Sequence, residues 1–229
     1  MVLSDQMPVL VLPETTLFPA SFLPAIITAP AQIKLMHDVI NGNRFLIVAM
    51  RKLHAKGQTP EPVACLGIPR IAVTAHDGSI RAVFQGLARV ELEERLITKP
   101  YPIYTYQVLE SPPFDTETVR ELLDEVCNLV EENLVKGKLV PFASQVSTYA
   151  IPKVVPADAT QSLITFLRSV DDPQQVTDFI SSTLLRRAKH RQTLLETLNL
   201  EARLKLLLKF LNTELRNSKK RKNRPNELF

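Results

Sequence analysis

Residues 9–24 have the sequence VLVLPETTLFPASFLP, in which two short apolar segments flank a loop that is bounded by prolines. The first segment stops at a proline, because proline has no backbone N–H to donate to a strand partner. One acid and two threonines follow before Leu17-Phe18-Pro19, and the second apolar segment carries Pro24. This pattern predicts two short β-strands over residues 7–12 and 22–28, joined by a compact loop.

Signals for β-structure continue to residue 113, and helical signals follow. Twelve of the seventeen prolines lie in residues 1–113, where they bound short apolar runs. Gly78 can adopt a positive φ and predicts a hairpin turn, and Pro69 inside an apolar run implies an edge strand or a bulge. The elements expected in this half are a helix over residues 30–41 and strands over residues 45–50, 63–74, 80–92 and 103–109.

The run from Ile80 to Leu92 has the clearest period of two in the chain. Its even-numbered positions are apolar or small, and most of its odd-numbered positions are polar or charged, as in a strand with one buried face. Gly86 lies midway, and glycine at such a place is typical of a bend or bulge in a sheet that curls into a barrel.

Helical spacing replaces this alternation in the second half. One helix is predicted to begin at Asp115-Thr116-Glu117-Thr118, which offers N-cap side chains and an acid in the first turn, and to end before Gly137. Asp172-Pro173 supplies an N-cap followed by proline at the first helical position. Further helices are expected over residues 157–170 and 173–184, and along the leucines between residues 200 and 215.

The formal net charge of +4 comes from the end of the chain. Residues 216–229 hold six basic side chains and one acidic, whereas the remaining residues hold 22 basic and 23 acidic. The body is therefore nearly neutral, which argues against a general attraction of the whole surface to nucleic acid. The basic cluster could still contact phosphates, or it could be a solubilising or frayed end. Its members are Lys219, Lys220, Arg221, Lys222 and Arg224.

The cysteines and the hydropathy of the chain indicate the cellular compartment. Cys65 and Cys127 are the two cysteines, and each lies in an apolar pattern, so we expect buried thiols in a reducing environment. No apolar run reaches the roughly 18–20 residues that span a bilayer. Residues 1–7 lack the basic start of a signal peptide. The sequence predicts a cytoplasmic protein with no membrane partner.

Motifs of enzyme chemistry are not found. The Gly137-Lys138 pair lacks the first glycine and the hydroxyl residue of a Walker A loop, and no Gly-x-Ser-x-Gly motif occurs. The four histidines are scattered without metal-ligand spacing. Glu91 and Glu93 share a strand face and could pair as acids, but a solvated outer face is the simpler interpretation. Serine and lysine are common in the chain, so a Ser–Lys catalytic dyad would have no recognisable sequence pattern. We expect no catalytic residue, no metal and no cofactor.

Several segments, taken in order, resemble the N-terminal substrate-binding domain of the Lon protease family. The first is residues 9–24, and the second is the hairpin from Leu66-Gly67 to Gln85-Gly86-Leu87-Ala88-Arg89-Val90. Residues 106–112 form the third. The fourth is Ser169-Val170-Asp171-Asp172-Pro173 with the helices beyond it, where Leu194-Leu195-Glu196 and Arg203-Leu204 fit a family pattern. The resemblance extends over about residues 7–215.

This resemblance implies an α+β fold, in which an N-terminal PUA-like β pseudo-barrel with one or two short helices precedes a C-terminal helical bundle. The implied ranges are residues 1–112 for the barrel, 113–216 for the bundle and 217–229 for a basic, disordered tail. Full-length family members continue into an AAA+ ATPase and a Ser–Lys protease domain. Here the charge cluster and Pro225 disfavour a continuing helix. We therefore expect a stand-alone protein that lacks both activities.

The function implied is a non-catalytic module that binds exposed apolar segments of unfolded or client proteins. It would act as an adaptor, a holdase or a regulator of proteolysis, and full-length Lon protease or a second copy could be partners. Leu17, Phe18 and Phe22 are the candidate contacts, although they could instead plug the end of the barrel. The alternative is RNA binding through the PUA-like barrel and the basic tail. A small-molecule site or an unrecognised enzyme in the barrel cleft is a third hypothesis.

Overall fold

The computed structural model describes residues 4–55, 57–141 and 157–222. Strands occupy the first half of the chain and helices the second, which confirms the predicted α+β class. The chain divides into two compact units between Glu110 and Ser111, close to the predicted boundary.

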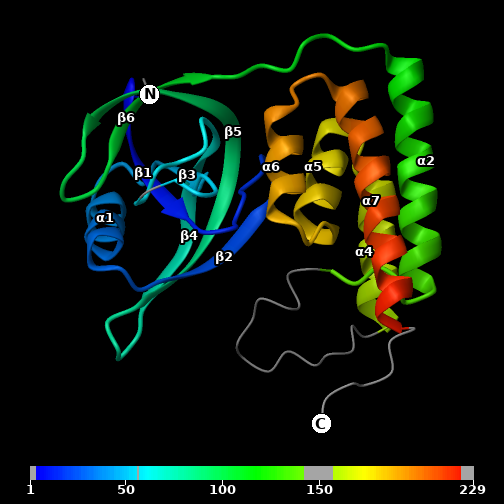
Figure 1. Cartoon of the computed structure of the whole chain (residues 1–229), viewed down its shortest axis with the longest axis horizontal. Coiled ribbons are helices and arrows are strands. Elements are labelled where there is room, and N and C mark those ends of the chain that lie inside the picture. Colours follow the sequence, from blue (N-terminus) through cyan, green and yellow to red (C-terminus); the bar gives the residue numbers. More distant parts are fainter. Residues whose placement is uncertain (1–3, 56, 142–156, 223–229) are drawn as a thin grey trace. The chain divides into compact units, whose positions relative to one another are not determined.

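The N-terminal unit is a curved six-stranded sheet with one helix packed beside it (Figure 1). The strand order is β2-β5-β4-β3-β1-β6, and an additional pairing of β5 with β6 closes five of the strands into a ring. Strand β2 lies outside this ring and pairs with the first half of β5. The elements are β1 (Gln6–Leu12), β2 (Phe22–Ile27), α1 (Pro30–Asn41), β3 (Leu46–Met50), β4 (Val63–Thr74), β5 (Ile80–Ile97) and β6 (Ile103–Val108).

Strands β1 and β3 are apolar at every inner position because they lie between two core clusters. One cluster takes side chains from all five ring strands, among them Val9, Ile47 and Val90, and fills the ring. The other takes Leu10 and Val48 from the opposite faces of the same strands and packs them against α1, β2 and the first half of β5. Burial on both faces explains why the sequence shows unbroken apolar runs here instead of alternation.

A β-bulge in β5 connects the two clusters. Leu66 pairs with Ala88 and Gly67 with Gly86, so Leu87 is the extra residue. One extra residue moves all later side chains to the other face of a strand. Phe84, before the bulge, therefore packs in the cluster under α1, whereas Val90 and Leu92 pack inside the ring. The even-numbered apolar pattern predicted the strand correctly, but its residues belong to two different core clusters, one before the bulge and one after it.

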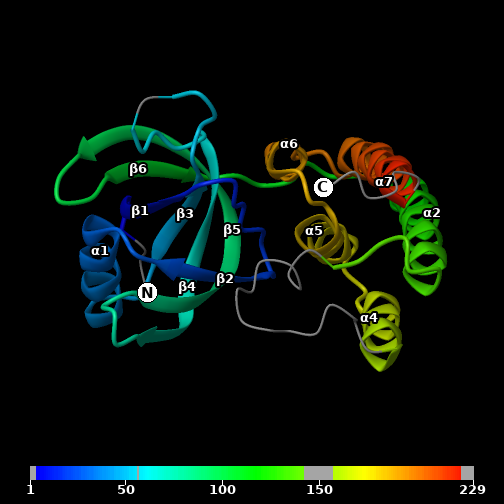
Figure 2. The same ribbon diagram turned by 60° about the horizontal axis from the view of Figure 1, so that its bottom comes forward.

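The C-terminal unit consists of helices (Figures 1 and 2). They are α2 (Thr116–Val135), α4 (Ala157–Ser169), α5 (Pro173–Leu184), α6 (Ala188–Glu196) and α7 (Leu200–Lys222). The predicted N-caps are confirmed: Asp115 Oδ2 accepts from Thr118 N at 3.0 Å, and Asp172 Oδ1 accepts from Gln174 N at 2.9 Å. Helix α7 contacts α2, α5 and α6, and thus forms the centre of this unit.

Helix α7 corrects the predicted start of the tail. It continues to Lys222 instead of ending at residue 216. Lysine and arginine are good helix formers, so the basic cluster extends the helix over part of the range that was predicted to be disordered. Residues 223–229, which include Arg224 and Pro225, lie outside the described residues.

A buried ion pair lies in the core of the C-terminal unit. Arg203 Nη1 is 3.0 Å from Asp178 Oδ1, and the two side chains are 0% and 2% exposed. Arg203 Nη2 also donates to the carbonyl oxygen of Leu198 at 3.0 Å and to Ser111 Oγ at 3.3 Å, while Ser111 Oγ donates to Gln174 Oε1 at 2.6 Å. This network joins the beginning of the unit to α5 and α7.

Candidate protein-binding surface

Two of the three predicted contact residues do not reach the surface. Leu17 and Phe18 are 1% and 0% exposed, and Leu17 belongs to the core cluster under α1. Phe18 is held in a turn in which Ser21 N and Ser21 Oγ both donate to its carbonyl oxygen, at 3.2 and 2.8 Å. Their position corrects the assignment as exposed contacts, because the loop folds its apolar side chains inward. Phe22 is 62% exposed.

Phe22 is part of a larger apolar surface that the sequence did not single out. Side chains alternate along β2, with Phe22, Pro24 and Ile26 exposed, while Ile27 is buried. On β4, Ile71 and Val73 are each 57% exposed. We call these five side chains the outer apolar face.

The strand register shows that these residues share one side of the sheet. Pro24 of β2 pairs with Val83 of β5, and Val83 pairs with Ile71 of β4. In the next row, Arg81 pairs with both Ile26 and Val73. Directly paired residues point to the same face, about 4.8 Å apart from strand to strand. The outer apolar face therefore lies on one side of the sheet, with Val83 of β5 between Pro24 and Ile71, and Arg81 of β5 between Ile26 and Val73.

A second bulge, in β4, is necessary for this arrangement. Pro69 pairs with Phe84 and Ile71 with Val83, so Arg70 is the extra residue. The bulge turns Ile71 and Val73 outward, onto the side that Ile68 occupies before it. This confirms the bulge predicted from Pro69. Large exposed apolar areas of this kind are typical of surfaces that bind other proteins.

Metal-ligating side chains are not gathered into a site in the described residues. No cluster of three or more histidine, cysteine, aspartate or glutamate side chains there could hold a metal ion. Both cysteine thiols are buried, as expected, and burial raises the pKa of Cys127 to about 11, so this thiol stays protonated at neutral pH. Glu91, Glu93 and Glu94 are exposed at the far half of β5.

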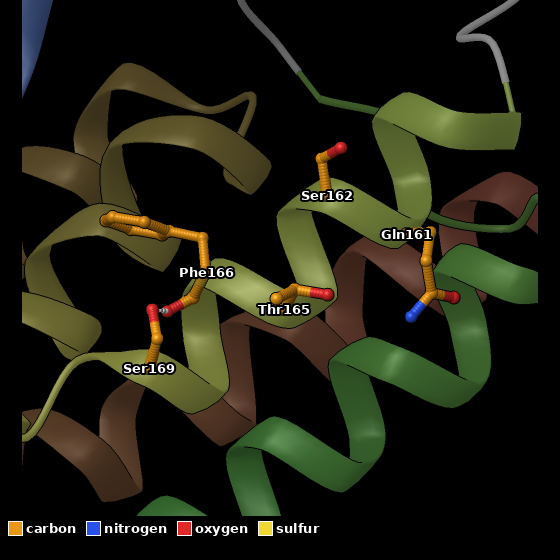
Figure 3. A pocket seen from close by; sticks show the side chains of 5 residues that line it. All are labelled: Gln161, Ser162, Thr165, Phe166 and Ser169. Atoms are coloured by element: carbon orange, nitrogen blue, oxygen red, sulfur yellow. Dashed lines mark hydrogen bonds between the residues drawn. The ribbon is translucent and has the colours of Figure 1, made fainter.

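The hollow beside α4 is an open surface depression of about 540 Å³. The five described residues that line it come from this one helix, and their side chains point in different directions (Figure 3). The one hydrogen bond drawn among them is local, from Ser169 Oγ to the carbonyl oxygen of Phe166. The hollow therefore offers no convergent set of groups for a small ligand.

The residues of the nucleic-acid alternative are placed only in part. The backbone of Lys219, Lys220, Arg221 and Lys222 is helical, and Arg224 lies outside the described residues. Their assignment to phosphate binding stays a prediction. In the part of the chain that the structure describes, no helix combines the length and the apolar character that a membrane span requires.

This chain is similar in sequence to known proteins. A Lon protease of Dictyoglomus thermophilum is 24% identical over 214 residues, which are 92% of this chain and 25% of that protein. Lon protease 2 of Thermus thermophilus is 25% identical, over 93% of this chain and 25% of its own length. The chain thus spans about a quarter of the length of these relatives.

Solved structures give the same fold. The N-terminal domain of the Mycobacterium avium complex Lon protease matches with a TM-score of 0.68 and 16% identity, over 90% of this chain and 98% of that one. The Lon N-terminal domain protein from Xanthomonas campestris matches with a TM-score of 0.59 and 13% identity, over the same shares. The family model of the ATP-dependent protease La (Lon) substrate-binding domain matches residues 6–213. Because that match covers nearly the whole chain, this protein belongs to the Lon substrate-binding domain family.

Proposed function

We propose that the chain is a non-catalytic recognition module that binds exposed apolar segments of unfolded proteins on its outer apolar face. The observation that carries the proposal is the row of exposed Phe22, Pro24 and Ile26 on β2, which shares one side of the sheet with Ile71 and Val73 on β4, across β5. Membership of a substrate-binding family supports it. The module would serve as an adaptor, a holdase or a regulator of proteolysis, and full-length Lon protease is a candidate partner.

The affinity of this face for a client segment would be modest, and its selectivity for particular sequences would be low. Burial of apolar area contributes about 25 cal/mol per Å², and a fully buried large side chain about 1.5–3 kcal/mol. The loss of translational and conformational freedom offsets much of this gain. An apolar surface also accepts many side chains, because the hydrophobic effect is not directional. Such a module would hold clients briefly and would release them without any chemical step.

Replacing Phe22 and Ile71 with serine tests the proposal. The double variant Phe22→Ser/Ile71→Ser should bind a chemically unfolded, fluorescently labelled model protein at least about tenfold more weakly, equivalent to roughly 1.4 kcal/mol. Fluorescence anisotropy measures the affinity, and light scattering measures the protection of the model protein from aggregation. The thermal midpoint should stay within about two degrees of wild type, because surface substitutions change stability little.

A matched control is Val135→Ser in the C-terminal unit, since Val135 is 73% exposed at the end of α2. This control should bind the unfolded protein as wild type does. Wild-type affinity in the Phe22→Ser/Ile71→Ser variant would show that the outer apolar face is not the binding surface.

A further inference from the structure

Two arginines line a hollow of about 360 Å³ in the N-terminal unit. Arg44 comes from the turn between α1 and β3, and Arg70 is the bulged residue of β4. Phe45, Ile68 and Pro69 form the apolar part of the wall, and Asn43 completes it. The hollow therefore combines two guanidinium groups with apolar surface.

The protein holds each arginine in place by its own contacts. Arg44 has a left-handed backbone, with φ of 65°, and its Nη2 donates to the carbonyl oxygen of Pro69 at 2.8 Å. Arg70 Nε donates to Gln85 Oε1 at 2.5 Å. Guanidinium has five N–H donors, so each arginine keeps further donors for a ligand.

Within the described residues, neither of these arginines has a carboxylate at ion-pairing distance. Other arginines in the chain differ in this respect. Arg168 lies 2.5 Å from Glu131, and Arg203 lies 3.0 Å from Asp178. The hollow thus carries two positive charges that no acidic side chain of the described chain balances.

The hollow is continuous with the outer apolar face. Gln85, which accepts from Arg70, is paired with Phe22 on one side and with Ile68 on the other. Ile68, which lines the hollow, therefore lies in the same cross-strand row as Phe22, and the side chain of Arg70 reaches that row through Gln85. An extended segment that lays apolar side chains along the outer apolar face would bring its next residues over the hollow.

We infer that Arg44 and Arg70 bind the side-chain carboxylate of an aspartate or glutamate that neighbours the apolar segment of a client. The inference rests on the proposed function, and it narrows the substrate class to apolar segments with an acidic neighbour. Arginine binds carboxylates through paired N–H donors and in a directed manner. Charge complementarity therefore selects among the many segments that the outer apolar face alone would accept.

Two peptides test the inference on the full chain. Both are blocked at the N-terminus and amidated at the C-terminus, and both carry three alternating apolar residues; one has a glutamate beside them and the other has a glutamine. Anisotropy should show roughly three- to tenfold tighter binding of the glutamate peptide at low salt. This preference should shrink at high salt, because exposed charge pairs are screened.

Substitution of both arginines should remove the preference for the glutamate peptide without weakening the binding of the glutamine peptide. The variant Arg44→Gln/Arg70→Gln should bind both peptides as wild type binds the glutamine peptide, and Arg95→Gln, on the exposed far half of β5, should behave as wild type. A third peptide carries lysine in place of the glutamate. The single variant Arg70→Glu should bind this lysine peptide more tightly than the glutamate peptide. Because Arg44 is unchanged in this variant, the result does not depend on whether substitution of Arg44 disturbs the fold.

The outcomes separate this inference from the proposed function. Equal binding of both peptides by wild type would overturn the carboxylate site and leave the apolar surface intact. Failure of both peptides and of the unfolded protein to bind would overturn both. A preference for glutamate that appears only in versions of the peptides with a free C-terminus would also reject the inference. So would arginine-dependent binding of a single-stranded RNA oligomer when neither peptide binds.

Discussion

Gly86→Ala should unfold the N-terminal unit under conditions in which the wild-type chain is stable. A Cβ atom at Gly86 would lie 2.0 Å from the carbonyl oxygen of Phe18 and 3.0 Å from Cys65 Sγ. The first of these neighbours is backbone and cannot rotate away. The strand and the loop would have to separate, so we expect a loss of roughly 3–5 kcal/mol from overpacking and broken hydrogen bonds.

The surrounding hydrogen bonds explain why moving the loop around Phe18 away from Gly86 costs free energy. Gly86 N donates to the carbonyl oxygen of Ser21, and Ala20 N donates to that of Gly86, both at 3.0 Å. The Phe18 carbonyl is itself held by Ser21 at 2.8 Å. Moving the loop by the width of a methyl group would break several of these bonds at once and would expose Phe18 and Leu17.

Urea denaturation followed by tyrosine fluorescence measures the effect, because three of the four tyrosines, Tyr101, Tyr104 and Tyr106, lie in the N-terminal unit. The midpoint should fall by roughly 1–2 M. Gly78→Ala is the matched control: its φ is 80°, but no atom lies within 4 Å of the added methyl. It should lose only about 1 kcal/mol. Equal midpoints for the two variants would show that the close approach at Gly86 carries no energetic weight.

Arg203→Met should destabilise the C-terminal unit by roughly 3–5 kcal/mol, because it leaves the carboxylate of Asp178 buried without its ion partner. Asp178 is only 2% exposed, so water cannot replace the lost guanidinium without opening the packing between α5 and α7. The same substitution removes the donors to Ser111 and to the Leu198 carbonyl oxygen. Far-UV circular dichroism during thermal unfolding reports the loss of helix.

A double variant distinguishes the charge effect from simple damage to packing. Arg203→Met/Asp178→Leu removes both charges and should recover more than half of the stability lost by Arg203→Met, since a buried pair is often replaceable by apolar side chains of similar size. If the double variant is instead as unstable as the sum of the two single variants, the pair does not act as a coupled unit.

Local signals allowed much of the fold to be predicted. Prolines and apolar runs located the strands, and the range 30–41 predicted for the first helix is the range of α1. Asp115 and Asp172 began helices because their side chains meet the first backbone N–H groups. These features depend on a few neighbouring residues, and so the sequence alone reveals them.

Features that depend on tertiary packing could not be predicted. Helix α6 was missed because Arg191 and Gln192 are part of its buried face, so its apolar period is weak. Leu17 and Phe18 have the same apolar character whether a loop turns inward or outward. Ile71 and Val73 share a mostly apolar strand with inward-facing residues, and only the bulge at Arg70 decides which side they take.

The bulge at Leu87 has a consequence for how the N-terminal unit responds to binding. Because β1, β3, β4 and β5 each supply side chains to both core clusters, neither cluster can dissolve while the other remains folded. We therefore expect the unit to melt cooperatively, without a partly open intermediate in which one face of the sheet has loosened. Its outer apolar face is a preformed surface, so a segment bound there as proposed would meet it already rigid. The ordering entropy of the proposed binding would then fall on the bound segment and not on this unit.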